Sequence, residues 1–139
     1  MKKQMCAVAL LCLALAGVAM AAKDAPAMPK IFANARFVYV TAYDGDQYSS
    51  NLLPDDRAAI SRVQDSLQKW GKLTLVYRPE DADMIVAVQS RPSEDVIAVY
   101  DGHSSSDTYL WRVMGRGGLQ KGETPLVSQF QTAFEKIKN

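Results

Sequence analysis

The chain has 139 residues, and its 16 lysines and arginines nearly balance 15 aspartates and glutamates, for a net charge of +1. The charges are interspersed and form no basic stripe, so nucleic-acid binding lacks an electrostatic basis. Both cysteines, Cys6 and Cys12, lie near the start of the chain, so the rest of it contains no disulfide, thiol nucleophile or zinc–thiolate site.

The start of the chain has the pattern of a signal peptide. Lys2 and Lys3 precede an uncharged run, rich in alanine and leucine, over residues 5–20. Ala19 and Ala21 then supply the small side chains that signal peptidase requires. The competing interpretation is an uncleaved membrane anchor, although the run is shorter than the roughly 20 strongly apolar residues of a spanning helix.

We expect residues 1–21 to be removed after Ala21, with Ala22 as a near alternative. Cleavage leaves 139 − 21 = 118 residues, and 14 basic against 15 acidic side chains give a net charge near −1. That length suits one domain of ordinary size. The sequence therefore predicts an exported protein, periplasmic or secreted, with no stable membrane insertion after cleavage.

The mature chain is predicted to begin with a linker and a strand. Residues 22–35 contain Pro26 and Pro29 among small and charged side chains, which is typical of an extended linker. Residues 36–139 then form the single folded domain. Its first strand covers residues 36–43, which are mostly aromatic or β-branched.

A long amphipathic helix is predicted over residues 54–70. Its apolar side chains recur every three or four positions, at Ile60, Val63, Leu67 and Trp70. Gly71 follows at the place where helices commonly end.

The second half of the chain is predicted to contain four more strands and a closing helix. The strands cover residues 73–77, 84–88, 96–100 and 108–114. The last two form a hairpin around the polar loop 101–107. Residues 115–123 are rich in glycine and predict a flexible connection.

The closing helix begins with Thr124 as N-cap and Pro125 as first helical residue. Its buried stripe is predicted to comprise Leu126, Val127, Phe130, Phe134 and Ile137. The element order is then β-α-β-β-β-β-α. We expect an α+β fold, a two-layer sandwich in which a mixed sheet of four to five strands packs against two main helices.

This arrangement resembles a group of small bacterial envelope domains. The likeness lies in "ADMIVAV", in "VYD" before a short polar loop, in "LWRVMGRGG" and in the closing amphipathic helix, and it spans roughly residues 37–137. Such domains are exported or lipid-anchored, and their function is mostly unassigned. The resemblance implies the fold and the compartment, and it implies no catalytic residue.

Four aspartates, Asp44, Asp46, Asp55 and Asp56, raise the possibility of a metal site. A calcium-binding EF-hand loop that starts at Asp44 would need glycine at its sixth position, where Ser49 stands. A turn after the first strand and a negatively charged first helical turn account for all four carboxylates. A weak metal site around Asp44 is retained as an alternative.

The loop 101–107, "DGHSSSD", has the residue types of a hydrolase triad. It holds His103, three serines and two aspartates. Triad members usually come from separate parts of a fold, so that each group points at the next, and no G-x-S-x-G motif is present. A solvated loop is the expected interpretation, and a periplasmic hydrolase that uses His103 is an alternative.

The leading hypothesis is a non-enzymatic envelope protein that binds a protein or small ligand. No catalytic residue, cofactor or metal ligand is assigned. We expect the partner to be an envelope protein or a second copy of the chain.

The interaction surface is predicted from the two faces of the sheet. Five strands about 4.8 Å apart make a sheet roughly 20–24 Å wide, and two helices can cover only one side of it. The other face keeps aromatic and apolar groups, which is typical of an interaction surface. Tyr39, Thr41 and Arg112 are the expected partner contacts on that face.

Overall fold

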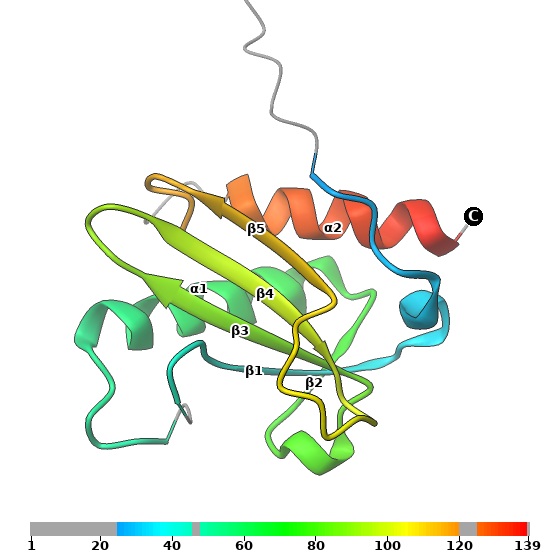
Figure 1. Ribbon diagram of the computed structural model, residues 1–139, viewed down its shortest axis with the longest axis horizontal. Helices are drawn as coiled ribbons and strands as arrows, with labels where there is room; N and C mark the ends of the chain where they lie inside the picture. Colours follow the sequence, from blue (N-terminus) through cyan, green and yellow to red (C-terminus); the bar gives the residue numbers. More distant parts are fainter. Residues whose placement is uncertain (1–24, 46–47, 120–124, 139) are drawn as a thin grey trace, which may run out of the picture.

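The computed structural model describes residues 25–45, 48–119 and 125–138 (Figure 1). The expected signal peptide lies outside these residues. The strands are β1 (Phe37–Ala42), β2 (Thr74–Val76), β3 (Met84–Ser90), β4 (Asp95–Asp101) and β5 (Trp111–Gly115).

One mixed sheet contains all five strands, in the order β2-β1-β3-β4-β5. β1 lies between β2 and β3 and runs parallel to both. β3, β4 and β5 form an antiparallel meander. The predicted α+β sandwich and its order of elements are confirmed.

Both main helices, α1 (Pro54–Trp70) and α2 (Pro125–Lys138), lie on one side of the sheet (Figure 1). α1 ends at Gly71, whose φ of 74° is the left-handed conformation that glycine tolerates best. The core between the layers holds Leu67, Phe130 and Phe134. Among the described residues, no helix is long and apolar enough to cross a bilayer.

The segment before β1 differs from the extended linker predicted for residues 22–35. Lys30–Asn34 form a 3-10 helix, η1, which packs against α2. Met28, Phe32 and Ala35 are buried in the core. The indole Nε1 of Trp111 donates a hydrogen bond to the Pro26 carbonyl oxygen at 2.6 Å. This part of the chain therefore belongs to the domain.

The described part of the glycine-rich segment, residues 115–119, packs against the domain. Gly118 touches α2 so closely that an added Cβ would overlap the side chain of Leu126. Leu119 is fully buried, and its carbonyl oxygen accepts a hydrogen bond from Nε of Arg62 at 2.6 Å. The predicted N-cap Thr124 lies outside the described residues.

Candidate functional site

The face of the sheet opposite the helices is the candidate functional site. Val38, Val40 and Ala42 of β1 belong to the core, so Phe37, Tyr39 and Thr41 point to the other side. Strand pairing aligns one row of residues across this open face. The row runs Thr41, Ala87, Ala98, Arg112.

The middle of the open face is hollow. Ala87 and Ala98 have small side chains and are almost fully buried, so the floor between Thr41 and Arg112 is low. Above part of this floor lies a cavity of about 510 Å³. Its lining includes Thr41, Tyr43, Ile85, Ala87, Tyr100, Asp101 and the loop residues Ser104, Ser105, Ser106 and Asp107. We call this cavity the tyrosine pocket.

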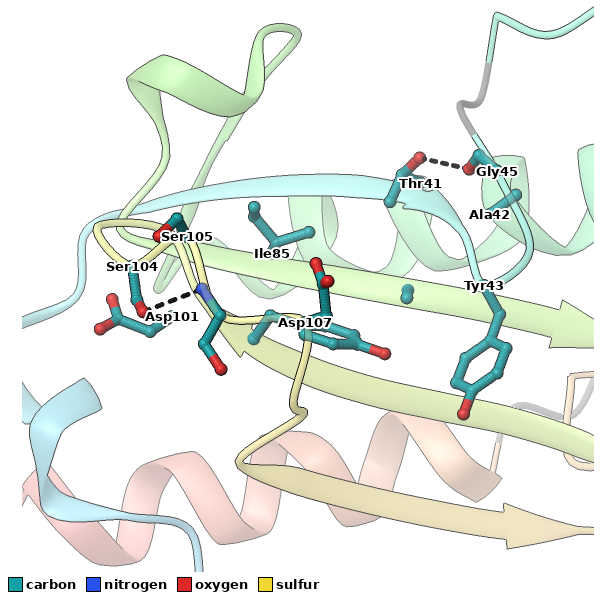
Figure 2. A pocket seen from close by; sticks show the side chains of 12 residues that line it. Thr41, Ala42, Tyr43, Gly45, Ile85, Asp101, Ser104, Ser105 and Asp107 are labelled. Carbon is teal, nitrogen blue, oxygen red and sulfur yellow. Dashed lines mark hydrogen bonds between the residues drawn. The ribbon is translucent and has the colours of Figure 1, made fainter.

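Figure 2 shows how β1, the sheet floor and the loop of residues 101–107, which we call the serine loop, surround the tyrosine pocket. Asp107 extends from the loop over the sheet, and Tyr43 stands at the opposite end. The Thr41 hydroxyl donates to the Gly45 carbonyl oxygen at 3.2 Å, which fixes the chain where it leaves β1. The pocket therefore combines an apolar floor with hydroxyl groups and a carboxylate at its rim.

Tyr100 lies at the centre of an aromatic and charged group. Burial raises the pKa of Tyr100, and the neighbouring Tyr43 adds to this effect while Arg112 opposes it. The hydroxyl therefore stays protonated at neutral pH and can donate a hydrogen bond. The Arg112 guanidinium lies over the ring of Tyr109, 4.8 Å from its centroid.

The loop that forms one wall of the tyrosine pocket is held by Asp83. Nε2 of His103 lies 2.9 Å from the Asp83 carboxylate. The other Asp83 oxygen accepts the backbone N–H groups of Arg36 and Phe37 at 2.8 and 3.0 Å. These bonds lower the pKa of Asp83, the one from Arg36 most. His103 therefore fastens the loop to the start of β1.

The serines of this loop make local contacts. Oγ of Ser104 accepts the backbone N–H of Ser106, and Oγ of Ser106 accepts that of Thr108. His103 is exposed and does not line the tyrosine pocket. The arrangement described here is that of a fastened loop, without the base-to-nucleophile contact of a hydrolase triad.

Arg91 binds the loop that follows β1 to the first turn of α1. Nη1 of Arg91 donates to both carboxylate oxygens of Asp56, at 2.6 and 2.7 Å, and its Nη2 donates to Asp44 at 3.1 Å. Asp55 and Asp56 occupy the first turn of α1, as predicted, and Asp46 lies outside the described residues. Among the described residues, no three His, Cys, Asp or Glu side chains gather as a possible metal site.

A second buried carboxylate, Asp95, joins the β3–β4 turn to the glycine-rich segment. It accepts hydrogen bonds from the Ser90 hydroxyl and the Leu119 backbone N–H, both at 2.8 Å. With Asp56 it makes this end of the sheet a network of charge-assisted hydrogen bonds. The network is structural, because each carboxylate is occupied by protein donors.

The three predicted contact residues lie on the open face but differ in exposure. Tyr39, on β1 between β2 and β3, is only 4% exposed, so its side chain offers almost no surface to a partner, contrary to the expectation from the sequence. Thr41 and Arg112 are half-buried. Sequence reasoning missed Tyr43 and Tyr100, although both end strands in the sequence and so could have been placed at the rim.

Comparison with protein-family models, curated proteins and solved structures finds no match to this chain.

Proposed function

We propose that this chain is an exported, non-enzymatic interaction domain of the bacterial envelope, and that the open sheet face binds a protein partner. One observation supports this proposal most directly. The face without helices exposes two large apolar side chains, Phe37 (41%) at the start of β1 and Met114 (43%) near the end of the edge strand β5. Large apolar side chains exposed on a sheet face that no helix covers are typical of interaction surfaces.

The chemistry of the surface suits a polypeptide. Tyr43, Tyr100 and Tyr109 offer rigid rings with polar ends, and the serine loop offers adaptable hydrogen bonds. Tyrosine and serine dominate binding loops that recognise proteins, and arginine is enriched at interface centres. Export is supported by the leader pattern and by the resemblance to envelope domains.

Site-specific photocrosslinking in intact cells tests the interaction. A photoreactive residue at Tyr109 should give a discrete adduct, which disappears in the Arg112→Glu, Met114→Glu double variant. The control probe stands at Gln68, an exposed residue of α1 on the helix side. Equal crosslinking from both positions, or an adduct that survives the double variant, would contradict the proposal.

Export has its own measurement. The mass of the protein recovered from the cell envelope should correspond to a chain that begins at Ala22 or Lys23. A recovered chain that still carries residues 1–21 would contradict the cleaved signal peptide.

A further inference from the structure

A second cavity lies on the other side of the molecule, against the outer surface of α2. It has a volume of about 650 Å³. Its lining residues come from two parts of the chain, and they are Ala25, Pro26, Ala27, Met28 and Lys30 on one side and Pro125, Ser128, Gln129, Thr132, Ala133, Lys136 and Ile137 on the other. We call it the α2 groove.

The walls of the α2 groove are largely apolar. Pro26, Met28 and Ala27 form one wall, and Ala133 and Ile137 lie at the base of the other. Because backbone N–H and C=O groups along the exposed side of a helix are already paired within the helix, this wall offers few backbone partners. A bound extended peptide would find few partners for its backbone groups on this wall, whereas a hydrocarbon chain has none to satisfy.

The charges at the groove have one sign. Among its lining residues, Lys30 and Lys136 carry the only charges, and both are exposed. The nearest carboxylate on α2, Glu135, is bound by Nζ of Lys72 at 2.9 Å and by Nε1 of Trp70 at 3.0 Å. Among the described residues neither lysine forms an ion pair, and two such ammonium groups beside an apolar groove favour a ligand with a negative head and a hydrocarbon tail.

We propose that the α2 groove binds a single-chain anionic amphiphile, a fatty acid, with its tail along the apolar walls and its carboxylate near Lys30 and Lys136. The cavity volume falls within the range of about 300–1,000 Å³ that small-ligand pockets occupy. The α2 groove shares no lining residue with the tyrosine pocket, although its Ala25, Pro26 and Gln129 also line a neighbouring cavity with Arg112 and Met114 at the edge strand β5.

Titration calorimetry with dodecanoate, below the concentration at which it forms micelles, tests this proposal. The purified protein should bind it saturably, with a single class of site. Dodecanol, which has the same tail and no charge, should bind about tenfold more weakly, as expected when two exposed ion pairs are lost. Equal affinity for both ligands would overturn the role of the lysines.

Two sets of variants separate the tail from the head. Thr132→Trp fills the groove and should reduce dodecanoate affinity more than tenfold, whereas Gln68→Trp, at an exposed position on α1, should not change it. Lys30→Gln with Lys136→Gln should reduce affinity about tenfold, and Lys69→Gln with Lys138→Gln should leave it unchanged.

Circular dichroism melting confirms that each variant is folded. Unchanged affinity in the folded Thr132→Trp variant would overturn the proposal, since the ligand would then bind elsewhere. So would binding of anionic vesicles in place of single-chain dodecanoate, because that result indicates a membrane-surface contact.

Discussion

At the scale of single residues, Arg91 controls the charge balance at one end of the sheet. It pairs with Asp56, whose side chain is only 6% exposed, and with the more exposed Asp44. Removal of the arginine would leave the Asp56 carboxylate in a nearly dry site, with the Ser90 N–H as its remaining hydrogen-bond donor among the described residues. A buried charge without a counter-ion is among the costliest defects in a folded protein.

We therefore expect Arg91→Met to lower the free energy of unfolding by about 3 kcal/mol, at the lower end of the usual range because Arg91 is 29% exposed. Urea denaturation measures the change. Arg78→Met is the control, since Arg78 is 71% exposed and should cost less than about 1 kcal/mol. Equal losses of unfolding free energy in the two variants would show that the Arg91–Asp56 ion pair stabilises the fold no more than an exposed ion pair does.

The contribution of Asp83 to the stability of the fold depends on pH. Its backbone hydrogen bonds hold its pKa below the ordinary 3.8. A carboxyl with a lowered folded pKa stabilises the protein above its unfolded pKa and loses that contribution as pH falls through the folded pKa. Asp83→Asn should therefore destabilise the protein at neutral pH, and the difference from the wild type should shrink below about pH 4.

Urea denaturation at about pH 6 and about pH 3 measures this difference. Asp81→Asn is the control, because its exposed carboxylate makes only a distant ion pair of 3.9 Å and should change little at either pH. His103→Ala should have only a small effect, because His103 is 69% exposed. A gap for Asp83→Asn that stays constant down to pH 3 would contradict the role of its charge.

At the scale of elements, the β4–β5 loop shapes the tyrosine pocket through a close backbone contact. The backbone N–H of Gly102 donates to the Asp83 carbonyl oxygen at 3.0 Å. A Cβ on Gly102 would overlap the backbone of Ala82. The loop can approach η2 (Pro79–Asp81) and the start of β3 this closely only with glycine here.

Gly102→Ala should therefore force the loop away and lower the free energy of unfolding by about 1–3 kcal/mol, the usual cost of overpacking. Gly45→Ala is the matched control, since an added Cβ there meets nothing within 4 Å. Thermal melting compares the two. A Gly102→Ala protein as stable as Gly45→Ala would mean that the loop yields without cost.

Most elements could be predicted from their own residues. The stripe of α1 and the β-branched runs of β3 and β4 have strong periodicity, so local sequence sufficed. The tyrosine pocket and the Arg91–Asp56 ion pair were harder to predict, because they depend on contacts between residues far apart in the sequence. The hollow exists only because Ala87 and Ala98 meet across β3 and β4, and Arg91 reaches Asp56 over 35 positions of the chain.

At the scale of the whole molecule, the domain extends further toward the N-terminus than its sequence suggested. Met28, Phe32 and Ala35 recur at intervals of four and three, a helical spacing that could have indicated burial. The prolines nearby favoured a linker instead. This segment is part of the core because it covers an apolar surface that α2 and Trp111 form.

Phe32→Ala should consequently lower the free energy of unfolding by about 3–5 kcal/mol, as expected for a large side chain lost from a core. Phe32 is 1% exposed. Its neighbour Ile31 is 61% exposed, and Ile31→Ala should cost less than about 0.5 kcal/mol. Chemical denaturation measures both changes. Similar small losses of unfolding free energy in the two variants would indicate that residues 25–35 form a linker and contribute little to the core.

The contact between Pro26 and Trp111 also bears on when the chain can fold. These residues are 85 positions apart, and Trp111 in turn packs edge-on against Phe130, with ring centroids 5.9 Å apart. A growing polypeptide therefore cannot close its core until almost the last helix has been synthesised. Contacts of such long range form slowly, because the loop entropy must be paid first. The contacts that join Pro26 to β5 and α2 are therefore among the last that a growing chain can complete.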